Sequence, residues 1–282
     1  MRYRITLLFA GLVSFLAMPA GAIEVERLFS PYQKLLDQHL IEHQPDDGGL
    51  VTAFNYDAAL AHPDTDSLLD DQRKRLAKVD PSGLDDRNQA IAFWLNAYNF
   101  FMIDQILTER PDGELISSVW DYGGRVNPFT KNIFERPLFN VGGEDYSLDQ
   151  MEKDILLGEE YGRKGWKEAR VHFAVNCASV GCPPLRQQIY TADNLEQLLA
   201  ENTRLAFNTP RHLEIAGSNL RLTELFDWYK ADFEDEAGSV RAFVRKWADD
   251  EVAEAVSQTS AIEYIDYDWS LNRPGNFPEL RR

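Results

Sequence analysis

The stretch DDRNQAIAFWLNAYNFFMIDQILTER, residues 85–110, decides the fold class. It has the pattern of one long helix, and Pro111 and Gly113 mark its end. Around its middle this helix is apolar on nearly every side, which is typical of a helix that neighbours bury on several faces. We therefore expect the remaining elements to pack around residues 85–110.

Outward from this helix, helical patterns outnumber strand patterns. Ser147 starts one of the helices with a capping box that Gln150 completes. The patterns together predict an α+β fold, a helix-rich single domain around a small, mainly antiparallel sheet. Further helices are expected over 30–42, 67–78, 191–206, 223–233 and 239–256, strands over 50–56, 171–176 and 261–267, and hairpins over 137–146 and 212–223.

The first 22 residues have the order of a secretory signal peptide. Arg2 and Arg4 precede an apolar run, and Ala20-Gly21-Ala22 has the small residues of a cleavage site. The apolar run is shorter than the roughly 20 residues that a spanning helix needs. We expect cleavage near Ala22 and a periplasmic or secreted protein without a membrane span.

No internal repeat, low-complexity tract or long linker divides the rest of the chain. We expect an N-terminal helical segment over 23–49, a main domain over 50–272 and a C-terminal tail over 273–282.

The charge balance narrows the choice of partners. The chain has 29 Lys and Arg against 46 Asp and Glu, a formal net charge of −17. Such a surface repels phosphate backbones and anionic lipids, so we expect no nucleic acid partner and a small-molecule or peptide substrate instead. His39 and His43 are four residues apart but lack a third ligand at motif spacing, so we expect no metal and no other cofactor.

Two amides interrupt the apolar helix. Asn96 and Asn99 are three residues apart and lie on one helical face. Each buried amide without a partner would cost roughly 1 to 3 kcal/mol, so both need hydrogen bonds. They either tie the helix to neighbouring backbone or line a site.

A carboxylate interrupts the next helix. On a helical wheel Glu152 falls within the apolar stripe formed by Leu148, Met151, Ile155 and Leu156. A carboxylate carried into a core either meets a cation or hydrogen-bond donors, or has a raised pKa that suits proton transfer. Structural pairing and a site role both remain open for Glu152.

The stretch VHFAVNCASVGCPPLR, residues 171–186, holds both cysteines of the chain. If residues 171–176 form a strand, alternate side chains share a face, so His172 and Asn176 point away from Cys177. A His172–Cys177 dyad would then need a bend in the chain or the return of Cys182. Cys182 precedes two prolines and is a candidate helix N-cap, where a thiol would be activated.

The cysteine pair also has a simpler interpretation. Exported proteins meet an oxidising compartment, and two cysteines five residues apart commonly form a disulfide. A disulfide between Cys177 and Cys182 and a reactive thiol at either residue therefore remain alternatives.

Five segments taken together resemble the DUF547 family, a domain of unknown function found in exported bacterial proteins and in larger plant and animal proteins. The segments are FWLNAYN, SLDQMEKDIL, RVHFAVNCASVGCPPL, FDWYKADF and YDWSLN, and the resemblance covers about residues 50–272. Plant members have serine where Cys182 stands and lack the histidine, which favours Cys177 for a shared chemical role. The family's motif positions correspond to Asn96, Tyr98, Asn99, Glu152, His172, Cys177, Cys182 and Pro183.

The first functional hypothesis is an exported thiol enzyme that acts on an acyl or amide bond, by distant analogy with papain-like enzymes. Cys177, or Cys182 as the alternative nucleophile, would attack, and His172 would accept the proton. Asn96 or Glu152 would orient the histidine, and the backbone amides of the 178–181 turn would stabilise the oxyanion. Residues expected to bind the substrate are Tyr98, Asn99 and Asn176.

The second hypothesis is a non-catalytic periplasmic binding or assembly domain, in which the disulfide between Cys177 and Cys182 is structural. Thiol–disulfide exchange is a third hypothesis. The spacing of the two cysteines disfavours it, because C-x4-C departs from the C-x-x-C of thioredoxin-like proteins.

Overall fold

The computed structural model describes residues 23–46, 48–124 and 131–281. The predicted signal peptide, residues 1–22, lies outside the described residues. Within them no helix is long and apolar enough to cross a membrane.

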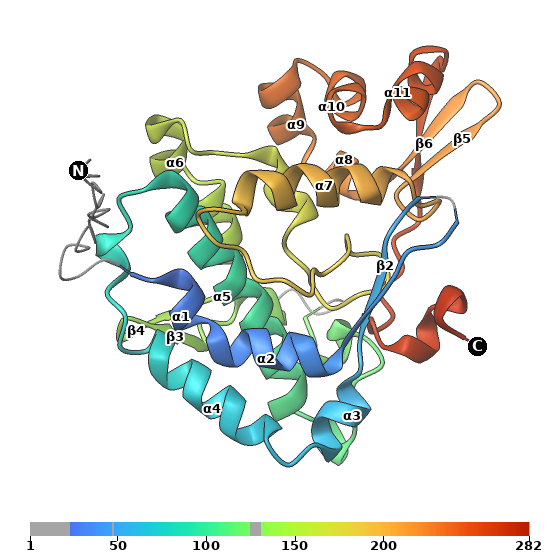
Figure 1. Ribbon diagram of the computed structural model, residues 1–282. Helices are drawn as coiled ribbons and strands as arrows, with labels where there is room; N and C mark the ends of the chain where they lie inside the picture. The colour runs from blue at the N-terminus through green and yellow to red at the C-terminus, as the bar shows by residue number, and fades with distance from the viewer. Residues whose placement is uncertain (1–22, 47, 125–130, 282) are drawn as a thin grey trace, which may run out of the picture.

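The central element is α5 (Arg87–Thr108), as the sequence predicts. Asp86 caps it by accepting a hydrogen bond from the backbone N–H of Gln89, and every residue from Ala90 to Leu107 is buried. Figure 1 shows α5 running through the body of the protein, with α2 (Ser30–His39) and α4 (Thr65–Leu76) below it and α7 (Leu195–Phe207) above. The amide-bearing face of α5 is therefore enclosed by other elements.

The N-terminal part adds α1 (Val25–Leu28), β1 (Leu40–His43), β2 (Val51–Phe54) and α3 (Tyr56–Ala61). The predicted helix over 30–42 is wrong at its C-terminal end, because α2 stops at His39. From Leu40 the chain pairs antiparallel with β2, Leu40 opposite Phe54, so its backbone groups are satisfied by the neighbouring strand.

The middle of the chain follows the prediction closely. The hairpin β3 (Phe139–Val141) and β4 (Glu144–Tyr146) forms at the expected place. The capping box is also present: Ser147 N–H donates to Gln150 Oε1 at 2.8 Å, and Gln150 N–H donates to Ser147 Oγ at 3.1 Å. The helical segment that follows, η5 (Gln150–Leu156), is a π-helix, and α6 (Glu159–Lys164) comes after it.

The C-terminal part contains α8 (Leu225–Trp228), α9 (Lys230–Ala237), α10 (Val240–Trp247) and α11 (Asp250–Ser257). The predicted helix over 239–256 is thus two helices, with extended backbone at Ala248 and Asp249 between them. The predicted hairpin forms as β5 (Leu213–Ala216) and β6 (Asn219–Thr223), and β7 (Ala261–Ile265) joins β6 in parallel.

The predicted strand over 171–176 is wrong. Residues Ala169–Phe173 form a short 3-10 helix, η6, and irregular backbone follows. Side-chain amides hold this backbone in place of a strand partner: Asn99 Nδ2–H donates to the carbonyl of Ala174 at 2.9 Å, and Asn202 Nδ2–H donates to that of Phe173 at 2.5 Å. The alternation argument that separated His172 from Cys177 therefore does not apply.

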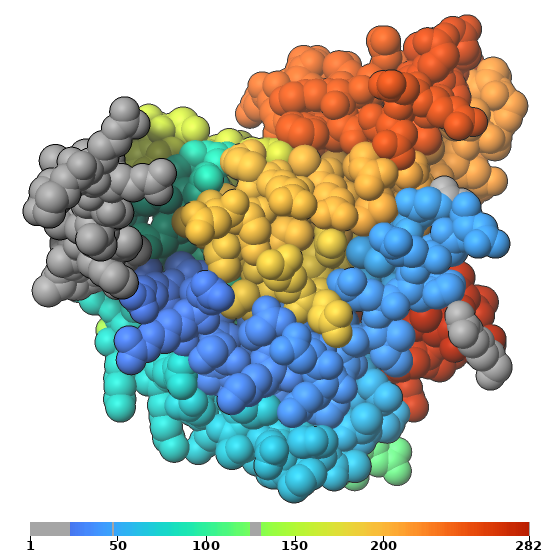
Figure 2. All heavy atoms as spheres, viewed as in Figure 1, coloured from blue at the N-terminus to red at the C-terminus, as the bar shows by residue number. Residues whose placement is uncertain are grey.

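The α+β prediction is confirmed, and the strands of the described residues are distributed over three small sheets of two, two and three strands. The larger hydrophobic core surrounds α5. A second cluster joins α7, the β5–β6 hairpin and α8 to α10 around Phe226 and Phe243. Figure 2 shows the C-terminal helices and hairpin as a projection above the body of the protein.

Candidate functional site

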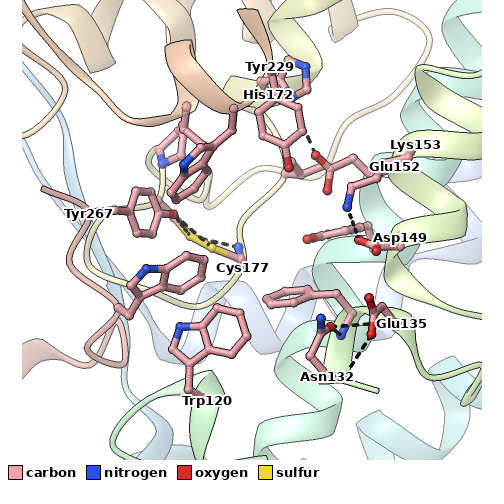
Figure 3. A pocket seen from close by; sticks show the side chains of 18 residues that line it. Trp120, Asn132, Glu135, Asp149, Glu152, Lys153, His172, Cys177, Tyr229 and Tyr267 are labelled. Carbon is pink, nitrogen blue, oxygen red and sulfur yellow. Dashed lines mark hydrogen bonds and ion pairs between the residues drawn. A yellow bond between two sulfur atoms is a disulfide. The ribbon is translucent and has the colours of Figure 1, made fainter. Parts of the chain in front are cut away.

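A pocket of about 260 Å³ lies where η5, η6, α8 and the 267–269 segment meet. It combines an aromatic side, an acidic side and the two cysteines. Figure 3 shows Tyr267 and Trp120 on one side, Glu135, Asp149 and Glu152 on the opposite side, and Cys177 between them.

The aromatic wall consists of Trp120, Trp228, Tyr267 and Trp269. Trp269 connects the others, with its ring centroid 4.9 Å from that of Trp120, 4.6 Å from Tyr267 and 5.7 Å from Trp228. Trp228 is 43% exposed, which is high for tryptophan. Ring faces on a pocket wall offer both apolar surface and the negative electrostatic potential that attracts cations.

The acidic wall consists of Glu135, Asp149 and Glu152. Lys153 is the cation among them, and its Nζ lies 2.9 Å from Asp149 Oδ1, so its charge is matched locally. Glu152 is only 5% exposed although it lines the pocket. The sequence prediction that this carboxylate enters the core is thus confirmed by its burial.

His172 lies between two carboxylates. Its Nε2 is 2.9 Å from Asp232 Oδ2, and its Nδ1 is 3.6 Å from Glu152 Oε1. Tyr229 stacks on the imidazole with a centroid separation of 4.0 Å, and Lys167 Nζ lies 2.6 Å from the other oxygen of Asp232. Burial alone would lower the pKa of His172, but the hydrogen bonds and charges of Asp232 and Glu152 outweigh it and raise the pKa above 6.5.

The same contacts change the ionisation of the neighbours of His172. Burial opposes ionisation of Asp232, but its pKa is lowered overall because His172 and Lys167 stabilise the carboxylate. Burial and the nearby Glu152 raise the pKa of Tyr229, so its hydroxyl stays protonated. His172 is therefore held as part of an ionic network across the pocket wall.

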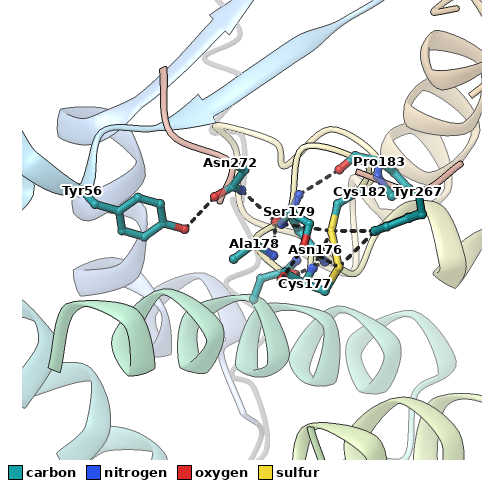
Figure 4. Close-up of a disulfide and its surroundings, with 10 residues drawn as sticks. Tyr56, Asn176, Cys177, Ala178, Ser179, Cys182, Pro183, Tyr267 and Asn272 are labelled. Carbon is teal, nitrogen blue, oxygen red and sulfur yellow. Dashed lines mark hydrogen bonds between the residues drawn. A yellow bond between two sulfur atoms is a disulfide. The ribbon is translucent and has the colours of Figure 1, made fainter. Parts of the chain in front are cut away.

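Cys177 and Cys182 form a disulfide, so the bridged alternative is confirmed; their Cα atoms are 6.3 Å apart. The bridge forms part of the pocket wall, and Figure 4 shows the hydroxyl of Tyr267 directed at it. The prediction of Cys182 as a helix N-cap is wrong, because residues 182–190 have irregular backbone. Pro184 disfavours helical backbone at Pro183, which would be the first residue of a helix capped by Cys182.

The turn between the two cysteines cannot stabilise an oxyanion, contrary to the sequence prediction. Its backbone amides are already used: that of Ala178 donates to Asn176 Oδ1 at 2.9 Å, that of Val180 to the carbonyl of Ser270 at 2.8 Å, and that of Gly181 to the carbonyl of Asp268 at 2.8 Å. The amide of Ser179 donates to Cys182 Sγ at 3.4 Å. The predicted oxyanion site at residues 178–181 is therefore wrong.

Five of the predicted site residues meet in this pocket and three do not. Tyr98, Glu152, His172, Cys177 and Cys182 line it. The remaining three, Asn96, Asn99 and Asn176, hold backbone.

Asn96 binds both polar groups of one residue, donating to the carbonyl of Tyr190 at 2.7 Å and accepting from its N–H at 3.0 Å. Asn99 donates to the carbonyl of Ala174 and accepts from the N–H of Asn176 at 2.8 Å. In the structure, therefore, Glu152 and Asp232 orient His172, and Asn96 does not.

The side chain of Asn176 extends the same framework. Its Nδ2–H donates to the carbonyl of Pro183 at 2.9 Å, and its Oδ1 accepts from Nδ2–H of Asn272 at 3.0 Å (Figure 4). These bonds fix the path of the chain on either side of the disulfide, so the amides position the site without lining it.

Sequence reasoning missed Asp232 and all four residues of the aromatic wall. Asp232 and Trp228 lie in FDWYKADF, and Tyr267 and Trp269 lie in YDWSLN. Both segments contributed to the family resemblance, but their spacing in the sequence does not indicate that they meet. The signal that could have indicated these site residues is the occurrence of aromatic residues next to an acid in two short segments.

The comparisons with known proteins add a family and no activity. A family model described as "Protein of unknown function, DUF547" matches residues 81–205. Neither a curated protein nor a solved structure matches the chain.

Proposed function

The chain belongs to the DUF547 family, and we propose that it is a non-catalytic binding protein, acting in the periplasm or outside the cell, whose pocket takes a small organic cation. The ligand carries an amine or a quaternary ammonium group. The observation that carries this proposal is the arrangement of an aromatic wall opposite an acidic one.

The aromatic wall suits a cation that is also apolar. The contact of an ammonium group with the face of a tryptophan ring stabilises binding by about 0.5 to 2 kcal/mol. An alkylated ammonium group also loses less hydration on entering the pocket than a metal ion would. Trp228 stacks on Trp269 at an interplanar angle of 21° and is 43% exposed, so its ring is held by a neighbour and is still accessible to such a group.

The acidic wall supplies the complementary charge. Glu152 is buried. Lys153 is paired with Asp149, so a carboxylate balances the positive charge of Lys153 beside the ligand. A buried carboxylate attracts a cation more strongly than one in water, because the local dielectric constant is lower.

Three observations support binding in preference to thiol catalysis. Both cysteines of the chain are in the disulfide, so the wall carries no free thiol in this state. Both ring nitrogens of His172 face carboxylates. The backbone amides of the 178–181 turn already have acceptors.

Tryptophan fluorescence tests the proposal, because three tryptophans line the pocket. Choline and putrescine are expected to change the emission saturably, whereas glucose and acetate are not. Trp228→Ala is expected to abolish the change. Trp166→Ala is the matched control, because Trp166 packs on Tyr161 and does not line this pocket. Saturable binding of glucose or acetate with no response to either cation would refute a cation site.

A further inference from the structure

The disulfide in the pocket wall has two unequal ends. Both cysteines line the pocket, but Cys177 is partly exposed whereas Cys182 is only 6% exposed. A small thiol in the pocket therefore reaches Cys177 more easily than Cys182.

Hydrogen-bond donors converge on Cys182. Its Sγ accepts from the backbone N–H of Cys177 at 3.0 Å, from the hydroxyl of Tyr267 at 3.1 Å and from the N–H of Ser179 at 3.4 Å. Near Cys177 Sγ lie the Tyr267 hydroxyl, also at 3.1 Å, and the Ser179 hydroxyl at 3.7 Å, but both backbone donors are directed at Cys182. These donors would stabilise a negative charge on Cys182 if the bridge opened.

Tyr267 is suited to remain a donor. Burial, with the charges of Glu152 and Asp268, raises the pKa of its phenol above the usual value of 10. The hydroxyl therefore keeps its proton at neutral pH and can donate to a thiolate that forms beside it.

We propose that the Cys177–Cys182 disulfide is a thiol–disulfide exchange centre for small thiols that enter the pocket, with Cys177 as the attacked sulfur and Cys182 as the leaving sulfur. This activity goes beyond ligand binding and does not require the organic cation.

The exchange balances without any further reagent. The thiolate of the incoming thiol attacks Cys177 Sγ, a new S–S bond forms, and the Cys177–Cys182 bond breaks with its electron pair on Cys182. If the reagent is a dithiol, its second thiolate attacks its own sulfur in the mixed disulfide and releases Cys177. The dithiol is then oxidised to a disulfide, and the protein is reduced to two thiols.

The direction of attack follows from the leaving group. In thiol–disulfide exchange the more stable thiolate leaves faster, and access decides which sulfur is attacked. Both factors select the same outcome here, because Cys182 has the donors and Cys177 has the exposure. The C-x4-C spacing does not matter for this assignment, since the donors come from the turn itself and from Tyr267.

The first experiment identifies the attacked sulfur. The native protein is treated briefly with 2-mercaptoethanol, the freed thiol is blocked with iodoacetamide, and peptides are mapped by mass spectrometry. We expect the mercaptoethanol adduct on Cys177 and the alkyl group on Cys182. The reverse assignment, or a bridge that opens only after the protein is denatured, would overturn the proposal.

The second experiment tests the donor. Dithiothreitol should reduce the bridge in the folded protein, and Tyr267→Phe should slow this reduction about threefold or more, because one hydrogen bond to the leaving thiolate is lost. Tyr264→Phe is the matched control, since Tyr264 is an exposed tyrosine of β7. Equal rates in the three folded proteins would contradict the proposed role of Tyr267. If Tyr267→Phe does not fold, the adduct mapping on the unaltered protein still decides the proposal.

Discussion

Nε2 of His172 lies 2.9 Å from Oδ2 of Asp232, a residue sixty positions later in the chain. This contact joins η6 to α9 and orients the imidazole so that its other nitrogen faces Glu152. The pocket therefore contains a charge that pH can remove, next to the carboxylate that we propose attracts a cation.

Cation binding should strengthen as pH rises. Below its raised pKa, His172 is positively charged and offsets the attraction of Glu152 for a ligand. Above that pKa the imidazole is neutral, so the attraction increases. The affinity for choline, whose charge does not titrate, is expected to rise between pH 6 and pH 9. His172→Gln should flatten this dependence, and an equally steep one in this variant would contradict the role of His172.

The free energy of unfolding should also report the protonation of His172. The pKa of this group is raised in the folded protein, so its contribution to stability is complete below pH 6.5 and is lost as pH rises through the folded-state pKa. Urea unfolding of the wild type and of His172→Gln at several pH values measures the difference. Burial raises the pKa of Asp104 to about 6, but Asp104 is present in both proteins, so its effect cancels. A difference that does not change with pH would contradict this prediction.

Glu152→Gln should weaken choline binding about tenfold, which corresponds to about 1.4 kcal/mol. The substitution keeps the size of the side chain and removes the charge. It should also lower the pKa of His172, which NMR titration of the imidazole measures. Glu159→Gln is the matched control, because the Glu159 side chain is 94% exposed. An unchanged choline affinity in Glu152→Gln would show that another group supplies the charge.

Asn99→Ala should destabilise the fold without altering the chemistry of the pocket. It would leave the carbonyl of Ala174 and the N–H of Asn176 unpaired in the interior, which costs about 2 to 4 kcal/mol in total. Asn219→Ala, which removes an exposed contact with Glu263, should cost less than about 1 kcal/mol. Equal losses of unfolding free energy in the two variants would contradict the framework role of Asn99.

Local signals in the sequence predicted most of the elements. The start and end of α5, the Ser147–Gln150 capping box and the two hairpins depend on residues close together in the chain, so their patterns are sufficient. The segment 171–176 was predicted wrongly because its β-branched and aromatic residues suit a strand. In the structure, amides of Asn99 and Asn202 bind its carbonyls, and these tertiary contacts outweigh the local preference.

The site was predictable only in part. Burial of Glu152 followed from the helical wheel, and the spacing of the cysteines gave their disulfide as one of two alternatives, because each feature depends on one segment. Asp232, Trp228 and Trp269 reach the pocket from two distant segments, and no periodicity in the sequence relates them to His172. The partners of His172 therefore required the three-dimensional arrangement.

The most direct test of the central claim compares choline with 3,3-dimethylbutan-1-ol, which has the same shape and no charge. Isothermal titration calorimetry of the full protein at pH 8 measures both affinities. If the aromatic and acidic walls form a cation site, choline should bind at least about tenfold more tightly than the alcohol. Equal affinities, or binding of the alcohol alone, would contradict the account.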